Sequence, residues 1–375
     1  MTAPGPVRAL SHPPAVQIRT LRLRDFRRFE EQTLQPAPGF NLIVGDNGSG
    51  KTSVLEAIHL MAHGRSFRGR VRDGLIRHGE ASLEVYLQWQ QGEGQHRAGL
   101  RHAGSKWEAR LDGDNVSHLG ELCAALAVVS FEPGSHILIH GSSEARRRYL
   151  DWGLFHVEQD FLPQWRRYAR ALKQRNALLR SHRSENQLDA WEHELAQAGE
   201  VLSVYRIAYV ARLQPHLDRL VTALFPSAGH LLLSLQPGWK MQEMALADAL
   251  LLTRERDQSQ GHTTIGPHRA DLRLEFNNFQ GRESLSRGQA KLAALSLLLA
   301  QAAQLAEHDG AWPVLQLDDL ASELDRHHQL RVLDYLHGSG AQVFVTGTEA
   351  PAGLASPGIE VNMFHVEHGV LQPSQ

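Results

Sequence analysis

The sequence predicts an α/β fold in which a mixed sheet with flanking helices is interrupted along the chain by a mainly helical insertion. Three observations lead to this expectation. The glycine-rich run GDNGSGKT (45–52) follows an apolar stretch at 40–44 and precedes apolar residues with helical spacing. A second apolar strand, VLQL (314–317), ends in two aspartates. Between these two strands, apolar residues from 188 to 205 recur three and four residues apart, as they do in a helix.

The first run has the spacing G-x-x-x-x-G-K-[ST] of a phosphate-binding loop. Its glycines let backbone N–H groups face phosphate oxygens at a helix N-terminus. We expect Lys51 to reach the β- and γ-phosphates of ATP and to assist catalysis, and the Thr52 hydroxyl to help hold Mg²⁺. The flanking strand and helix disfavour the alternative of an ordinary glycine-rich turn. The predicted nucleotide-binding residues are Gly45, Asp46, Asn47, Gly48, Ser49, Gly50, Lys51, Thr52 and Ser53.

Asp318 and Asp319 come directly after the strand 314–317. The carboxyl ends of strands form the rim where α/β sheets bind ligands, so we expect Asp318 to be the second Mg²⁺ ligand beside Thr52. Asp319 is placed to polarise the attacking water and is our candidate catalytic carboxylate. Taken alone, the pair could also be two solvated acids that end a strand.

The run LSRGQ (285–289) precedes a helical pattern of apolar residues, which places Ser286 and Gly288 at a helix N-terminus. Such a terminus attracts anions. The chain already has its own phosphate loop, so a second site of this kind is useful if it contacts the γ-phosphate held by another copy. We assign Ser286, Gly288 and Gln289 to nucleotide binding and Ser286 also to catalysis. Without the other motifs, the run would be an ordinary N-cap.

In this order, the three motifs resemble those of ABC-type ATPases. LSRGQ is similar to the signature LSGGQ, with Arg287 at the first glycine, and Asp319 stands where most of these ATPases have glutamate, which suggests slow hydrolysis. Further runs resemble the RecF family, bacterial ATPases related to SMC heads. These runs are LRLRDFRRFE (21–30), NLIVGDNGSGKTSVLEAIHLMAHGRSFR (41–68), RRRYLDWGLFH (146–156), LKQRNALLR (172–180), TTIGPHRADL (263–272), LSRGQAKLAAL (285–295), LDDLASELD (317–325) and MFHVEHG (363–369).

The RecF resemblance implies an ABC-type P-loop ATPase head with an inserted helical arm, and ATP and Mg²⁺ as cofactors. It also implies a homodimer that forms around ATP on single- or double-stranded DNA at gaps and junctions. Such a protein is a mediator of DNA repair and replication restart, a weak DNA-stimulated ATPase that helps RecR and RecO load recombinase. The stretch 131–141 and Gly347 depart from the family pattern, and no Q-loop glutamine is assigned.

Two other functions agree with the motifs. One is a nucleotide-gated DNA scaffold with negligible hydrolysis, which Asp319 in place of glutamate favours. The other is the ATPase subunit of an ABC transporter, which the helical arm disfavours.

We divide the chain into a disordered N-terminal tail, a split head and an arm. The tail, residues 1–15, is rich in proline. The head comprises residues 16–130 and 255–375, and the arm comprises residues 131–254. Two helices joined near 181–186 are expected to form an antiparallel hairpin within the arm.

Overall composition does not by itself indicate a nucleic-acid partner, because the net charge is −2 and the isoelectric point about 6.9. Local clusters of arginine do indicate a nucleic-acid partner. Such a cluster can also be a solvated or ion-paired face. A further basic group lies between 166 and 183. We assign DNA contacts to Arg65, Arg68, Arg70, Arg146 and Arg147.

Other features bear on location and metal binding. No apolar run approaches the roughly 20 residues of a membrane-spanning helix, and the N-terminus lacks the pattern of an export signal. The sequence has a single cysteine, Cys123, so it cannot form an internal disulfide. This agrees with a cytoplasmic location. Histidines are numerous but lack metal-binding spacing. We therefore expect a cytoplasmic protein without a membrane partner.

Overall fold

The computed structural model describes residues 15–68, 74–104, 106–181, 185–354 and 358–373. The chain forms two compact units. Unit 1 comprises residues 1–133 and 305–375, and unit 2 comprises residues 134–304. All but one residue of the predicted disordered tail, and Arg70 among the predicted DNA contacts, lie outside the described residues.

The core of unit 1 contains a six-stranded sheet in the order β14-β13-β3-β12-β11-β8. All neighbouring pairs except β13 with β14 are parallel. Strands β11 and β12 are buried along their whole length, as expected for a sheet covered on both faces. The strands are β3 (Phe40–Val44), β8 (Val128–Phe131), β11 (Val314–Leu317), β12 (Val343–Gly347), β13 (Val361–Glu367) and β14 (Val370–Pro373).

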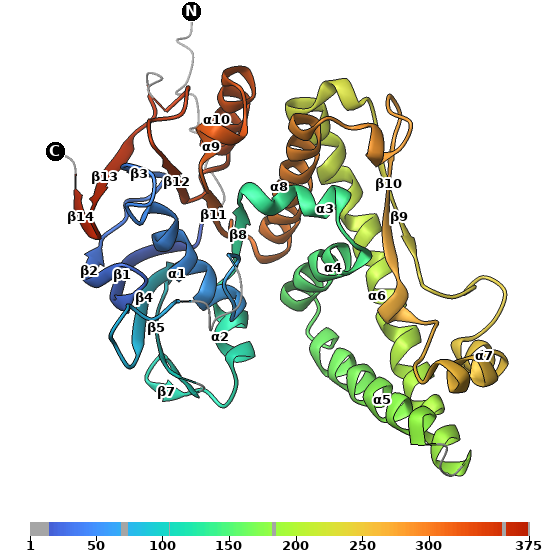
Figure 1. The fold of residues 1–375 in the computed structure, drawn as a ribbon. Helices are drawn as coiled ribbons and strands as arrows, with labels where there is room; N and C mark the ends of the chain where they lie inside the picture. The colour runs from blue at the N-terminus through green and yellow to red at the C-terminus, as the bar shows by residue number, and fades with distance from the viewer. Residues whose placement is uncertain (1–14, 69–73, 105, 182–184, 355–357, 374–375) are drawn as a thin grey trace, which may run out of the picture. The chain divides into compact units, whose positions relative to one another are not determined.

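A second, antiparallel sheet of unit 1 has the order β2-β1-β4-β5-β6-β7. Its strands alternate between buried apolar and exposed polar residues, so one face packs and the other meets solvent. The buried face packs on helix α1, which also contacts β8 and β12 and so lies between the two sheets (Figure 1). The strands are β1 (Gln17–Phe26), β2 (Phe29–Leu34), β4 (Leu83–Gln91), β5 (Gly94–Ala103), β6 (Lys106–Leu111) and β7 (Asp114–Asn115).

Four α-helices of unit 1 connect these strands. Helix α1 directly follows β3, and eleven of its thirteen residues are buried, because both sheets cover it. The others complete the connections from β7 to β8 and from β11 to β12. The helices are α1 (Lys51–His63), α2 (Leu119–Ala125), α9 (Leu320–Glu323) and α10 (Arg326–Ser339).

Unit 2 is mainly helical, with one antiparallel strand pair, β9 with β10. Helices α5 and α6 form the predicted antiparallel hairpin, and α7 packs beside both (Figure 1). The elements are α3 (Ile137–His140), α4 (Ser143–Val157), α5 (Phe161–Ser181), α6 (Glu185–Leu224), β9 (Leu231–Gln236), α7 (Leu246–Gln260), β10 (Asp271–Phe276) and α8 (Arg287–Asp309); short 3₁₀ turns lie at Pro133–His136, Pro226–Ala228, Pro267–Arg269 and Arg282–Ser284.

The boundaries of the two units differ from our division of the sequence. The first falls at 133/134, close to the predicted 130/131, but the second falls at 304/305, within α8. Residues 255–304, including the signature run, therefore pack with the helical unit. Strand β10 pairs with β9, and α4 contacts β10, which explains this grouping.

A buried ion-pair network holds the α5–α6 hairpin to α7. The Arg175 guanidinium is fully buried and binds Glu192 at 2.8 Å and Asp257 at 2.8 Å. It also donates to the Thr263 hydroxyl at 2.8 Å. The network joins the RNALLR and TTIGPHR runs of the sequence, so these runs have a structural role in the arm.

Candidate nucleotide-binding site

The predicted phosphate loop connects β3 with α1 and lies against β13. Gly45 has φ +155°, and a Cβ atom added there would lie 2.2 Å from the Val366 carbonyl oxygen, so only glycine fits. Gly50 has φ +124° immediately before α1. Because the first N–H groups of a helix have no intrahelical acceptor, Lys51 and Thr52 present theirs to the loop. The local conformation is thus that of an anion site.

The Lys51 ammonium closes over this loop. Its Nζ donates to the Gly45 carbonyl at 2.6 Å and to the Asp46 carbonyl at 2.8 Å. Burial lowers the pKa of Lys51, and the carboxylates of Asp319, Asp318 and Asp46 oppose that shift. The loop therefore holds the cation in place beside the helix N-terminus, where a phosphate group would meet it.

Thr52 and Asp318, the two predicted metal ligands, are in direct contact. The Thr52 hydroxyl donates to Asp318 Oδ1 at 2.9 Å. Two neighbouring ligands of an octahedral Mg²⁺, each about 2.0–2.1 Å from the ion, lie about 2.9 Å apart. Their spacing therefore fits Mg²⁺, which would take further ligands from water and nucleotide phosphates. Among the described residues, no group of three or more histidine, cysteine or acidic side chains forms a metal cage.

Thr346, at the end of β12, links the two aspartates. Its hydroxyl donates to Asp318 Oδ1 at 2.6 Å and accepts the Asp319 N–H at 2.9 Å. Burial raises the pKa of Asp318, whereas the bonds from Thr346 and Thr52 lower it. The two hydrogen bonds thus offset part of the effect of burial on this carboxylate, which is 4% exposed.

Asp319 has a backbone conformation that is uncommon for a residue with a side chain. Its φ is +53° and its ψ is +41°, in the left-handed region. Its Oδ1 accepts a hydrogen bond from the Ser322 hydroxyl at 2.9 Å. Such conformations concentrate at functional sites, where the surrounding structure enforces them. The carboxylate is therefore held at a defined place one residue beyond the metal ligand.

These groups share one pocket of about 830 Å³ in unit 1. It contains the predicted residues Asn47, Gly48, Gly50, Lys51, Thr52, Ser53, Asp318 and Asp319. Gly45 and Asp46 contribute carbonyls to Lys51 instead, and Ser49 is buried beneath the loop.

The pocket also contains residues that sequence reasoning missed. Glu132 directly follows the buried strand β8, the same signal that identified Asp318, and Thr346 is a buried residue near the end of β12, but neither belongs to a motif. The pocket also includes Arg27, Arg28 and His78, which lie in turns. Residue spacing in the sequence does not predict where these turns lie in the fold. Arg68 lines the pocket as well, and its charge lowers the pKa of Asp318. The structure therefore places Arg68 in the pocket of the candidate nucleotide site.

The prediction that Arg146 contacts DNA is wrong, because this side chain is buried. Arg146 is 1% exposed and binds both oxygens of Asp271, at 2.7 Å and 3.0 Å. Its neighbour Arg147 donates to the Ala270 carbonyl at 2.6 Å and to Ser143. Both arginines thus join α4 to the β10 region. Arg65 is exposed.

The signature run, in unit 2, forms a reciprocal N-terminal cap on α8. The Ser286 N–H donates to Gln289 Oε1 at 2.8 Å, and the Gln289 N–H donates to Ser286 Oγ at 3.3 Å. Ser286 and Gly288 are exposed. The ordinary N-cap role is therefore present, and it presents the hydroxyl and the glycine backbone at a free helix N-terminus.

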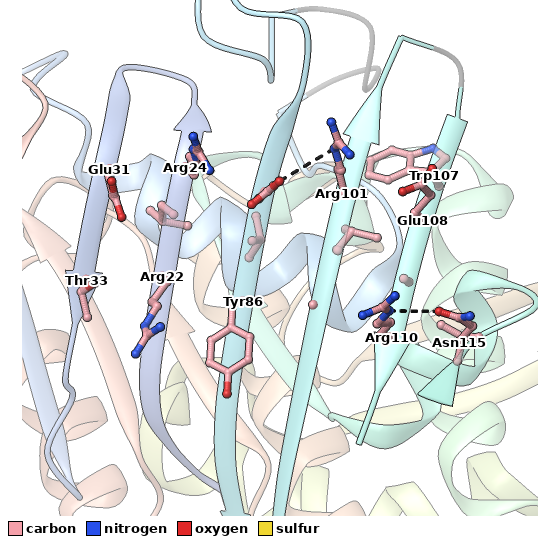
Figure 2. A pocket seen from close by; sticks show the side chains of 17 residues that line it. Arg22, Arg24, Glu31, Thr33, Tyr86, Arg101, Trp107, Glu108, Arg110 and Asn115 are labelled. Carbon is pink, nitrogen blue, oxygen red and sulfur yellow. Dashed lines mark hydrogen bonds and ion pairs between the residues drawn. The ribbon is translucent and has the colours of Figure 1, made fainter. Parts of the chain in front are cut away.

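A second hollow of unit 1 lies on the outer face of the antiparallel sheet (Figure 2). Acidic and basic side chains alternate across five neighbouring strands of this face, and Arg101 lies 3.8 Å from Glu84. Because neighbouring charges along this row compensate one another, the row offers no concentrated positive charge to an anionic ligand. We interpret it as a solvated charge ladder. The ladder is Glu31, Arg24, Glu84, Arg101 and Glu108.

The phosphate loop after a parallel strand, the aspartate at the end of β11 and the antiparallel sheet over α1 define an ABC-type P-loop ATPase head. A solved SMC head bound to a domain of ScpA has this fold, with a TM-score of 0.59 over 96% of this chain and 97% of that one, at 16% identity. The predicted fold class is confirmed.

The family model described as RecF/RecN/SMC N terminal domain matches residues 17–370. The "DNA replication and repair protein RecF" of Stenotrophomonas maltophilia is 58% identical, covering 94% of this chain and 98% of the relative. The protein of the same name from Shewanella denitrificans is 38% identical, covering 94% of this chain and 98% of the relative. A solved structure of the "recombination mediator protein RecF-ATP in RecFOR pathway" has a TM-score of 0.86 at 25% identity, covering 98% of this chain and all of that one. The chain belongs to the RecF family.

One further observation concerns membranes. Within the described residues, no helix combines the length and apolar composition needed to cross a bilayer.

Proposed function

We propose that this chain is an ATP-dependent, DNA-binding recombination mediator of DNA repair and replication restart. The observation that carries the proposal is the Thr52–Asp318 contact beside the Lys51 loop, the donor set of a nucleotide–Mg²⁺ site. Relatives named for DNA replication and repair, and a RecF–ATP structure from the RecFOR pathway, supply the biological class. Because the chain belongs to the RecF family, the transporter alternative loses its support.

Each residue of the pocket has its own role in this proposal. The loop N–H groups and Lys51 would bind the phosphates. Thr52 and Asp318 would hold Mg²⁺, which would supply positive charge to offset that of the phosphates. The Thr346 hydroxyl favours the ionised form of Asp318 by donating to it, and it fixes the backbone of Asp319 by accepting the Asp319 N–H. Asp319 orients the attacking water and accepts its proton. Its carboxylate is one methylene shorter than glutamate, so we expect slow, DNA-stimulated hydrolysis.

In this proposal a second copy completes the site. Ser286, Gly288 and Gln289 at the exposed α8 N-terminus contact the γ-phosphate held by the Lys51 of the other copy, so ATP joins two heads. We retain the functional division into a head (16–130 and 255–375) and an arm (131–254). The dimer acts in the cytoplasm at gapped or junction DNA, and RecR and RecO are its partners by family resemblance.

Static light scattering with and without ATP and Mg²⁺ tests the dimer. We expect the mass to double from 41.8 kDa only when both are present. A mass that does not respond to nucleotide would contradict the proposal.

The nucleotide-gated scaffold is a second candidate, favoured by the bond that ties the Asp319 carboxylate to Ser322. Turnover assays with and without duplex DNA separate the two. Hydrolysis that stays at the level of an Asp319→Asn variant under both conditions would favour the scaffold.

A further inference from the structure

The outer side of α5 carries a line of positive charges. At 3.6 residues per turn, Arg166, Arg170, Lys173 and Arg180 fall within an arc of about 80° and span about 21 Å of helix. All four are exposed. The opposite side of the helix is buried against α6. The line is therefore a single straight cationic edge of the hairpin.

The acids of the neighbouring helices are already engaged by other arginines. Glu194 binds Arg167 at 2.7 Å, and Glu192 binds Arg175. Arg254 of α7 pairs with both Asp189 and Glu192. Within the part of the chain that the structure describes, none of the four line residues forms an ion pair. The hairpin therefore compensates the charge of this line only in part, near Arg170, whose charge acts on the Glu194 carboxylate.

A pocket of about 510 Å³ opens beside the first half of this line. Its wall includes the Trp191 ring and the Glu194 carboxylate, which pairs with Arg167. The Arg170 guanidinium carbon lies 5.8 Å from the centre of the Trp191 ring. Arg166 and Arg167 line the same pocket. Guanidinium groups bind phosphate oxygens through paired N–H donors, and an aromatic face accepts a sugar or base edge. The pocket therefore suits a nucleotide unit more than an isolated anion.

We propose that this edge of α5, with the Trp191 pocket, binds the phosphodiester backbone of duplex DNA. The proposal rests on the proposed function for the class of partner, and it moves the main DNA contact from the arginines we assigned by sequence to the arm. Duplex DNA has one negative charge per about 1.7 Å of its axis, so a 21 Å line of cations faces about a dozen phosphates. A stiff duplex matches a straight line without being ordered first. Backbone contacts alone predict binding that is independent of base sequence.

The test is a variant with Arg166→Ala, Arg170→Ala and Lys173→Ala together. Its affinity for two unrelated 30-base-pair duplexes is measured by fluorescence anisotropy between 50 and 200 mM salt. Three lost phosphate contacts should flatten the slope of log affinity against log salt by about 2.7 and weaken binding about 10²-fold near 150 mM. Both duplexes should be affected equally.

Two matched variants control for net charge and for folding. Arg24→Ala, Arg101→Ala and Arg110→Ala on the face in Figure 2 remove the same charge and should leave the salt slope unchanged. Arg166→Lys with Arg170→Lys keeps the charge and should keep most of the slope. The affinity for ATP should be unchanged in all variants, which shows that unit 1 is intact.

Three outcomes would overturn the inference. The first is an unchanged slope in the α5 variant, and the second is an equal loss in the charge-matched control. The third is a loss confined to single-stranded DNA, which would assign the edge to single strands. Failure of the unaltered protein to bind DNA at any salt concentration would instead overturn the proposed function, so the two failures are distinguishable.

Discussion

At the scale of single residues, the chemistry of the site depends on hydroxyl groups as much as on charges. Thr52 and Thr346 both donate to the same oxygen of Asp318, and Thr346 also accepts the Asp319 N–H. A buried carboxylate without these donors would be protonated more readily. One threonine therefore acts both on the ionisation of the proposed metal ligand, Asp318, and on the backbone position of the proposed catalytic residue, Asp319.

Replacement of Thr346 by valine removes the hydroxyl and keeps the shape. The pKa of Asp318 should rise, and a protonated carboxyl cannot bind Mg²⁺. The pH at which Mg²⁺-dependent ATP binding reaches half its maximum should therefore move upward. Isothermal titration between pH 5 and pH 8 measures this shift, with binding of ATP in EDTA as the control. An unchanged pH profile would show that Thr346 does not govern Asp318.

Lys51→Met should abolish productive ATP binding and leave the fold intact. A charge-assisted hydrogen bond to phosphate is typically worth about 1.5–3 kcal/mol, so affinity should fall at least about tenfold. Equilibrium binding of a fluorescent ATP analogue measures the loss, with Lys240→Met, an exposed lysine of unit 2, as the control. Equal affinities for the two variants would remove the loop from the nucleotide site.

The predicted site residues that the structure brings together share a local cause. The loop motif and Asp318 are identified by spacing along a few residues, and the structure brings them into one pocket. Thr346 and Glu132 reach that pocket only because β12 and β8 both neighbour β11, a pairing that no local pattern encodes. The prediction that Arg146 contacts DNA is wrong for the same reason, because its ion-pair partner Asp271 lies 125 residues away in the sequence.

At the scale of elements, the hairpin was predictable and its anchoring was not. Apolar spacing indicates α5 and α6, whereas the pairing of Arg175 with Glu192 and Asp257 depends on the packing of three helices. The position of residues 255–304 in unit 2 follows from the β9–β10 pairing, again a contact distant in sequence.

Arg175→Met should destabilise the helical unit far more than Arg167→Met on the same helix. Loss of one partner leaves buried carboxylates without their cation, which costs about 3–5 kcal/mol. The exposed Arg167–Glu194 pair contributes at most about 1 kcal/mol. Urea unfolding followed by tryptophan fluorescence gives both values. If the two variants unfold at the same urea concentration, the buried network does not stabilise the hairpin.

At the scale of the whole molecule, the proposed clamp requires two copies, each with a phosphate loop and an exposed α8 cap. Ser286→Arg should leave ATP binding by the monomer near normal and block assembly, hydrolysis and stable DNA binding together. Light scattering and ATPase assays measure this. A mixture with Lys51→Met protein contains one intact loop facing one intact cap, so some ATPase activity should return.

The control for this variant is Ser286→Ala, which removes the hydroxyl that caps α8 without adding bulk. Loss of a cap costs about 0.5–2 kcal/mol of stability, and assembly should persist in part. If Ser286→Arg lowers the ATP affinity of the monomer as much as Lys51→Met does, the signature acts within its own chain.

The place of β3 in its sheet also has a consequence for biosynthesis. Its two neighbours are β12 and β13, and the loop glycine Gly45 rests against a β13 carbonyl. A ribosome adds about 5–20 residues per second, so the roughly 300 residues between β3 and β12 take about 15–60 s to make. During that time the nascent strand has neither neighbour. We therefore expect the phosphate loop to reach its final conformation only after residue 367 has left the ribosome, so that a partly made chain neither captures ATP nor joins a second copy.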